Sequence, residues 1–110
     1  MYKVLIAEDE LLTRAGIVSS VNWAQLNMQI VAQADDGIQA LQLYRAHYPE
    51  IVITDLNMPR LGGVELIGKI CEEERPCKII VVTCVEDVQV ITRLFPYHIF
   101  DFLRKFFHNS

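Results

Sequence analysis

The chain has 110 residues, of which 52% are hydrophobic and 22% are charged, and its formal net charge is −4. This length suits one globular domain and excludes two, and the hydrophobic fraction argues against disorder. The negative balance excludes a domain that binds nucleic acid by itself, because no basic surface offsets the phosphate charge.

Membrane and secretory functions are also disfavoured. Acidic residues at positions 8–10 interrupt the first apolar run before it reaches the length of a signal sequence, and no other run is long enough to span a membrane. The three cysteines are odd in number and lack C-x-x-C spacing, which favours reduced thiols over a metal or disulfide framework. We therefore expect a cytoplasmic protein.

Short apolar runs predict five strands in chain order, at residues 4–7, 30–32, 51–53, 79–82 and, more weakly, 99–103. The first four runs are nearly unbroken rather than alternating. Strands of this kind are buried on both faces of a parallel sheet, and we expect such burial for each of them.

Helical periodicity lies between these runs. Apolar residues recur at Leu11, Ala15 and Val18, and again at Ala40, Leu41 and Tyr44, and residues 64–73 and 86–95 complete the set. The alternation of strands and helices predicts βαβ units with right-handed crossovers. The fold class is therefore α/β, with an open, doubly wound parallel sheet.

Polar residues follow four of the predicted strands. Glu8 and Asp9 follow the first, Asp55 the third, Thr83 the fourth and Lys105 the fifth. Ligands bind such sheets outside the carboxyl ends of the strands. Taken singly, these residues have structural explanations. Asp9 or Glu10 could be the N-cap of the first helix and Thr83 that of the fourth, Asp55 could lie in a turn, and Lys105 could lie in solvent. None of these explains why the acids and the lysine share one edge.

Three acids and one lysine in one pocket leave two negative charges uncompensated. At ~4 Å each like-charge pair costs about 1 kcal/mol in water and about 4 kcal/mol at a dielectric constant of ~20. A hard divalent cation with oxygen ligands would neutralise them, so the sequence predicts a Mg²⁺ site, with Mn²⁺ as the second choice.

The motifs resemble the receiver domain of two-component response regulators. The resemblance rests on Glu8-Asp9, on Asp55 followed by Met58-Pro59 and Gly63, on Thr83 and on Lys105, which occur in family order over nearly the whole chain. The segments at 22–23 and 35–37 look like the AraC-type subfamily. The resemblance implies a flavodoxin-like five-stranded parallel sheet of order 2-1-3-4-5.

The resemblance also implies residue roles. Asp55 would accept a phosphoryl group from a sensor histidine kinase. Glu8, Asp9, Asp55 and the backbone carbonyl of Asn57 would be the Mg²⁺ ligands. Thr83 and Lys105 would contact the phosphoryl oxygens, and Thr83 and Phe102 would form the switch. The domain would be no enzyme beyond its own phosphorylation and dephosphorylation, and DNA would be bound by an output domain absent from this chain.

Two departures from the family matter. Phe106 follows Lys105 where the family carries a cis-proline, and a cis bond there would cost ~3 kcal/mol. Too few residues follow Lys105 for a fifth helix, so we expect residues 1–110 to be a receiver domain truncated at its C-terminus, whose uncovered face is hidden by self-association.

Other functions remain open. A receiver-like interaction module that works without phosphorylation is the first alternative. A small phosphatase or a flavodoxin-like carrier of the same topology is the second. The first lacks support because the acidic residues, Thr83 and Lys105 are all present. Against the second, Asn57 stands where an aspartyl phosphatase needs an acid, and residues 8–10 would repel a flavin phosphate.

Overall fold

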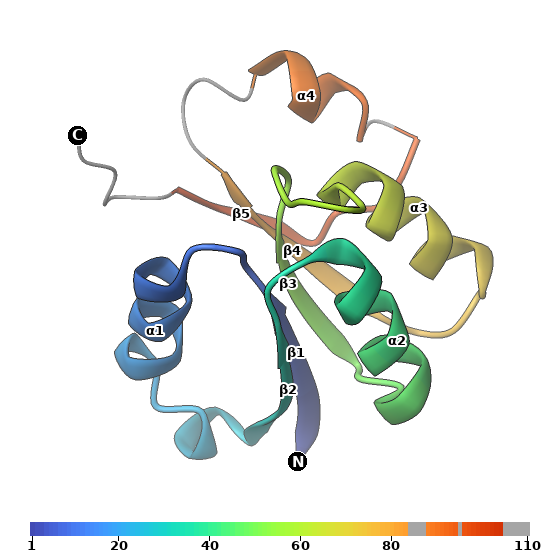
Figure 1. Ribbon diagram of the computed structural model, residues 1–110. Helices are drawn as coiled ribbons and strands as arrows, with labels where there is room; N and C mark the ends of the chain where they lie inside the picture. Colours follow the sequence, from blue (N-terminus) through green and yellow to red (C-terminus); the bar gives the residue numbers. More distant parts are fainter. Residues whose placement is uncertain (84–87, 95, 105–110) are drawn as a thin grey trace.

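The computed structural model describes residues 1–83, 88–94 and 96–104 as one parallel sheet flanked by helices (Figure 1). The five strands lie in the order β2-β1-β3-β4-β5, and every neighbouring pair is parallel. The strands span Tyr2–Ala7 (β1), Met28–Ala34 (β2), Ile51–Asp55 (β3), Lys78–Thr83 (β4) and Asp101–Arg104 (β5). The predicted fold class and strand order are thus confirmed.

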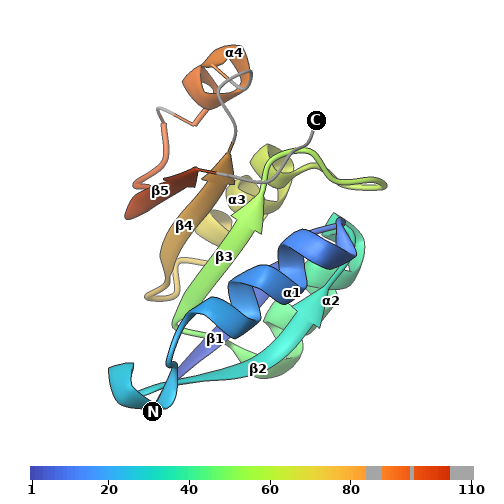
Figure 2. The same cartoon turned by 90° about the vertical axis from the view of Figure 1, so that its left-hand side faces the viewer.

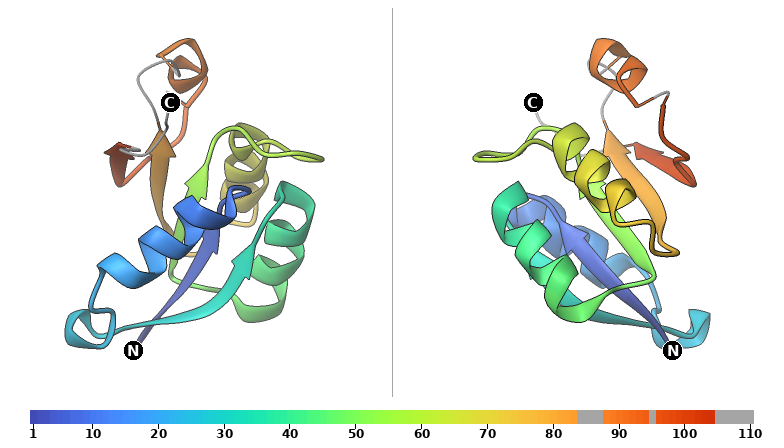
Figure 3. Two further views of the ribbon diagram at one scale, coloured as in Figure 1. Left: turned by 60° about the vertical axis from the view of Figure 1, so that its left-hand side comes forward. Right: turned by 90° about the vertical axis from the view of Figure 1, so that its right-hand side faces the viewer.

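The helices cover both faces of this sheet. They span Leu11–Ser20 (α1), Gly37–His47 (α2), Gly63–Glu72 (α3) and Val88–Thr92 (α4), with a 3₁₀ turn at Ala24–Leu26. Helix α1 lies on one face, and α2 and α3 lie on the other (Figures 2 and 3). The predicted fourth helix began at residue 86 and ended at 95, and residues 84–87 and 95 lie outside the described part of the chain.

Each face has its own apolar core. The larger core joins β1, β3 and β4 to α2 and α3, and also takes in Ile91 of α4 and Leu94, which follows that helix. The smaller one lies under α1 and includes Val4, Ile6 and Trp23. Trp23 is fixed there because its indole Nε1 donates to the carbonyl of Val18 at 2.9 Å.

The expected burial of the strands on both faces is only partly correct. Every residue of β3 is buried, and so are the last four of β1. In β2 only Ala34 is buried. The reason is position, because β2 is an edge strand of the sheet and β3 is its centre. An apolar run alone does not separate the two cases.

No helix in the described ranges is long and apolar enough to cross a membrane.

Candidate functional site

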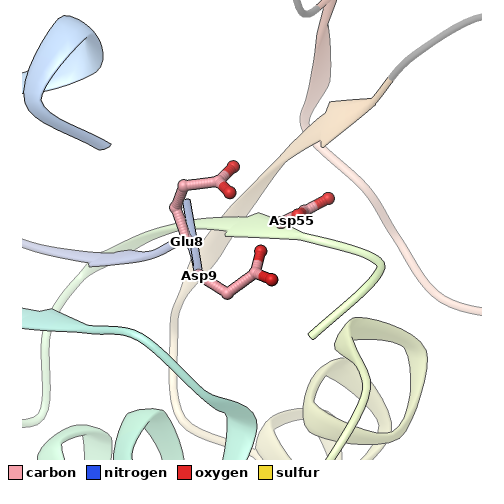
Figure 4. A group of neighbouring side chains, drawn as sticks. All are labelled: Glu8, Asp9 and Asp55. Atoms are coloured by element: carbon pink, nitrogen blue, oxygen red, sulfur yellow. The ribbon is translucent and has the colours of Figure 1, made fainter. Parts of the chain in front are cut away.

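The candidate functional site is an acidic pocket at the carboxyl ends of β1 and β3. Ala7 pairs in register with Thr54, so the residues that follow, Glu8 and Asp55, leave neighbouring strands side by side. One carboxylate oxygen from each of Glu8, Asp9 and Asp55 lies within 4.8 Å of the others (Figure 4). The predicted convergence of these three acids is confirmed.

Burial differs among the three acids. Glu8 is 0% exposed and Asp55 is 1% exposed, whereas Asp9 is open to solvent. Backbone groups stabilise the buried members: Oε2 of Glu8 accepts a hydrogen bond from the N–H of Glu10 at 3.0 Å. Burying carboxylates is costly without such partners, so the pocket concentrates negative charge that a bound cation would offset.

The carboxylate of Asp55 is held by the loop that follows it, residues 56–62. Its Oδ1 accepts from the N–H of Leu56 at 2.7 Å and from that of Asn57 at 3.3 Å. Gly63 lies against the carbonyl of Asp55, where an added Cβ would come within 2.0 Å of that oxygen. Asp55 therefore takes part in a turn, as its local sequence allows, and also points into the acidic pocket.

Of the two residues expected as possible caps of the first helix, Asp9 and Glu10, Glu10 stands at the N-cap and Asp9 does not. The side chain of Glu10 makes no capping hydrogen bond to the helix. Oε1 of Glu10 instead accepts from the hydroxyl of Thr13 at 3.1 Å. Glu8 and Asp9 are thus left to the pocket, where their carboxylates face Asp55.

The donor set suits a divalent cation of the Mg²⁺ type. All three ligand groups are hard carboxylate oxygens, which Mg²⁺ and Mn²⁺ prefer. Oxygens around an octahedral Mg²⁺ lie about 3 to 4 Å apart, so the spacing found here needs only small side-chain rotations to close on an ion. The predicted metal fits the residues that are present.

Three of the four remaining predicted site residues, Thr83, Phe102 and Asn57, lie in the described part of the chain. Thr83 ends β4, and the preceding Val82 pairs with Asp55, which places the backbone of Thr83 at the pocket edge. Phe102 lies on β5 beside Val81 and is 43% exposed. Asn57 is in contact with Asp55 through its own N–H. Lys105 lies outside the described residues.

Two basic residues near the pocket were missed by the sequence analysis. Arg14 donates from Nη1 to the backbone carbonyl of Glu8 at 2.6 Å and so ties α1 to the end of β1. Arg60 forms an ion pair with Asp36 across the 56–62 loop. Arg14 could have been identified from its place one turn into the helix that follows the acidic pair. No local sequence pattern indicates that Arg60 pairs with Asp36.

Comparison with known proteins identifies the family. The response regulator receiver domain matches residues 4–110. A response regulatory protein of Staphylococcus epidermidis is 38% identical over 105 residues, and the transcriptional regulatory protein HptR of Staphylococcus aureus is 34% identical over 105 residues. Each match covers 96% of this chain but 41% of the relative, so the chain spans well under half the length of these relatives.

Solved structures of related proteins support the same family. The receiver domain of AraT, a response regulator from Geobacillus stearothermophilus, is 36% identical with a TM-score of 0.91, over 94% of this chain and 81% of that one. A two-component transcriptional regulator AraC from Clostridium phytofermentans is 32% identical with a TM-score of 0.86, over 96% and 81% of the two chains. Given these matches and the acidic pocket, the chain belongs to the response regulator receiver domain family.

Proposed function

We propose that this chain is the phosphoacceptor domain of a two-component system and that Asp55 receives the phosphoryl group. The observation that carries the proposal is the convergence of Glu8, Asp9 and Asp55 within 4.8 Å at the carboxyl ends of β1 and β3. Family membership supports it, because a receiver domain is a signalling module rather than an enzyme that turns over an external substrate.

The proposed reaction transfers a phosphoryl group from a histidine nitrogen to a carboxylate oxygen of Asp55. An oxygen of the Asp55 carboxylate attacks phosphorus, the P–N bond of a phosphohistidine breaks, and the departing imidazole keeps its electron pair. Attack of water on the resulting acyl phosphate later releases inorganic phosphate and restores the carboxylate. The two N–H groups on Oδ1 of Asp55 hold the carboxylate in a fixed orientation for the attack.

A bound Mg²⁺ would supply the positive charge that phosphoryl transfer requires next to these acids. Asp9 and Asp55 would hold it directly, Glu8 through a water molecule and Asn57 through its backbone carbonyl. Thr83 and Lys105 would contact the phosphoryl oxygens, with Thr83 and Phe102 as the switch. The exposed position of Phe102 on β5 leaves this ring room to move.

The proposed partners follow from this role. A sensor histidine kinase donates the phosphoryl group, and an AraC-type output domain binds DNA. HptR and the Clostridium phytofermentans protein are both named as transcriptional regulators, which supports that output. The thiols of Cys71 and Cys77 are free, which suits the reducing cytoplasm.

We also propose self-association. Strand β5 is an edge of the sheet, and apolar side chains are exposed on and beside it, namely those of Phe100, Phe102 and Leu103. Exposed apolar edges pair readily with a second copy. Sedimentation velocity at rising concentration should show a dimer, and a monomer at every concentration would exclude this part of the proposal.

The central test is intact mass after incubation with acetyl phosphate and Mg²⁺. The parent chain should gain one phosphoryl group that hydroxylamine removes, and Asp55→Asn should gain none. Asp35→Asn changes an exposed aspartate outside the pocket and serves as the matched control. An unmodified parent would exclude phosphotransfer and favour a module that binds partners without phosphorylation.

A further inference from the structure

Arg60 has an unusual backbone conformation next to the phosphoacceptor. Four residues other than glycine have positive φ in the described ranges: Asn27, Tyr48, Arg60 and Glu74. Three of them end helices, where the left-handed conformation is ordinary: Asn27, Tyr48 and Glu74 donate their N–H groups back to Ala24, Tyr44 and Cys71. Arg60 ends no helix and lies in the 56–62 loop with φ of 70°.

The backbone at Arg60 forms a γ-turn. The N–H of Leu61 donates to the carbonyl of Pro59 at 2.8 Å, which closes the turn around Arg60. A γ-turn whose central residue has positive φ is rare and strained, and a side chain larger than that of glycine adds to the strain. Strain of this kind persists only where surrounding contacts impose it, and it is concentrated at functional sites.

The side chain of Arg60 forms an ion pair with the start of α2. Nη1 of Arg60 lies 3.2 Å from Oδ2 of Asp36. The other oxygen of Asp36 caps α2 by accepting from the N–H of Gln39 at 2.7 Å. The acceptor is therefore fixed in place by the helix, although the Arg60 side chain is 63% exposed.

A close backbone contact reinforces the pair. The Cα of Gly37 packs against Leu61, and an added Cβ would lie 1.9 Å from the Leu61 carbonyl oxygen. The N–H of Gly37 also points to the carbonyl of Pro59 at 3.4 Å. The start of α2 and the γ-turn are thus packed backbone to backbone, and the ion pair between Asp36 and Arg60 joins the same two segments.

The same loop orients Asp55. Its first two N–H groups, from Leu56 and Asn57, hold Oδ1 of Asp55, and its far end is anchored where the N–H of Gly63 donates to the carbonyl of Leu56 at 2.8 Å. The γ-turn lies between these two anchors. A change in the turn would shift the donors that set the direction of the Asp55 carboxylate.

We propose that Asp36 and Arg60 are positioning residues, whose ion pair holds the γ-turn that orients Asp55 and Asn57 toward the metal and phosphoryl site. The part of this proposal that concerns metal and phosphoryl transfer rests on the proposed function. A pair this exposed contributes little to global stability, so its effect should be felt at the loop rather than in the melting temperature.

The test compares four variants of the full chain with the parent. Asp36→Asn keeps a capping oxygen but loses the charge, Arg60→Ala removes the pair and keeps the turn strain, and Arg60→Gly removes both. Arg60→Lys is the conservative variant. Arg45→Ala is the matched control, because it removes an ion pair with Glu73 of similar exposure that does not touch the loop.

Two readouts are measured beside the melting temperature. Amide hydrogen exchange at Leu56, Asn57 and Leu61 in metal-free protein reports the loop, and Mg²⁺ titration reports the pocket. Asp36→Asn and Arg60→Ala should speed exchange at these amides and weaken Mg²⁺ binding, each by about three- to tenfold, with melting temperatures within about 3 °C of the parent. Arg60→Lys and Arg45→Ala should stay close to the parent.

The Arg60→Gly variant separates the loss of the ion pair from the strain of the turn. Because it adopts positive φ without strain, Arg60→Gly should fall between the parent and Arg60→Ala. Equal losses in the two variants, parental behaviour of Asp36→Asn and Arg60→Ala, or losses that merely follow a lower melting temperature would each overturn the proposal. If the parent neither binds Mg²⁺ nor takes a phosphoryl group, the proposed function fails, and the exchange data in metal-free protein still decide whether the pair holds the turn.

Discussion

The hydroxyl of Tyr44 offers a sharp test of how this domain is stabilised. Tyr44 lies on α2 and is fully buried in the larger core, and its hydroxyl has no hydrogen-bond partner among the described residues. A buried polar group without a partner costs about 1 to 3 kcal/mol. We therefore expect Tyr44→Phe, which removes only that hydroxyl, to raise the free energy of unfolding at pH 7 by about 1 kcal/mol.

The titration of the Tyr44 hydroxyl adds a second expected result, a pH dependence of the difference in stability between parent and variant. Burial, with smaller contributions from Cys77 and Glu73, raises the pKa of Tyr44 from 10.0 to about 12. A group whose folded pKa is raised contributes stability that is complete below its unfolded pKa and is lost as the pH rises from 10 to 12. At pH 11 this loss is about 1.4 kcal/mol in the parent and zero in Tyr44→Phe.

Urea unfolding at pH 7, 9 and 11 measures both effects. The fluorescence of Trp23, which is the one tryptophan in the sequence, reports the transition because its indole is held by Val18 in the smaller core. Burial also raises the pKa of the Cys77 thiol to about 12, and because burial and not Tyr44 is the main cause, this titration is nearly the same in both proteins and contributes little to the difference. The advantage of Tyr44→Phe should thus be constant from pH 7 to 9 and larger at pH 11.

Tyr48→Phe is the matched control. Tyr48 stacks edge-on against Tyr44 at 6.4 Å between ring centroids, yet it is 46% exposed, so loss of its hydroxyl should change stability by less than about 0.5 kcal/mol. A destabilisation of Tyr44→Phe by more than about 1 kcal/mol at pH 7 would refute the reasoning, because it would show that the hydroxyl is hydrogen-bonded. So would a difference between parent and variant that does not grow above pH 9.

Three further predictions concern the pocket and its loop. Asp55→Asn should raise the free energy of unfolding of the metal-free protein by at least about 1 kcal/mol, because it removes one of three neighbouring charges. In thermal melts with Mg²⁺ the melting temperature of the parent should rise to that of the variant or above it, because the ion stabilises the parent more. Asp9→Asn should weaken Mg²⁺ binding at least about tenfold by calorimetry, with an unchanged circular dichroism spectrum, and parental affinity would exclude Asp9 as a ligand. Gly63→Ala should destabilise the fold by about 2 kcal/mol or more in urea melts, because its Cβ would meet the Asp55 carbonyl at 2.0 Å, whereas Gly68→Ala, which meets only the Tyr97 side chain, should cost less.

The large features of this molecule could be predicted from the sequence because they depend on patterns that physics constrains strongly. Unbroken apolar runs indicate buried strands, and parallel connection brings their carboxyl ends to one edge, which was enough to place Glu8 and Asp9 beside Asp55. The apolar spacing of Ala40, Leu41 and Tyr44 predicted a helix that the structure shows as α2, with Asp36 as its capping residue. The apolar runs predicted equal burial for β2 and β3, because composition does not distinguish an edge strand from a central one.

Features that depend on one backbone conformation were beyond the sequence analysis. Residue preference argues against positive φ at an arginine, so the γ-turn at Arg60 and its pairing with Asp36 gave no local signal. The missing partner of the Tyr44 hydroxyl is likewise a property of the packed core, because the sequence pattern places this side chain inside without saying what it meets there.

The arrangement of the pocket has a consequence for how signalling would be coupled to the fold. Glu8 and Asp55 are themselves buried at the carboxyl ends of β1 and β3, which are neighbouring inner strands of the sheet, so their charges cannot move away from one another without opening the sheet. The repulsion between these charges must then be reduced by an ion that enters the pocket or by movement of the segments at its rim. The 56–62 loop is the part of this rim that contacts Asp55 directly, and it is fastened to α2 through Asp36 and Gly37. A change of charge at Asp55 would therefore be transmitted first to this loop and the start of α2, in addition to the β4–β5 side where Thr83 and Phe102 lie.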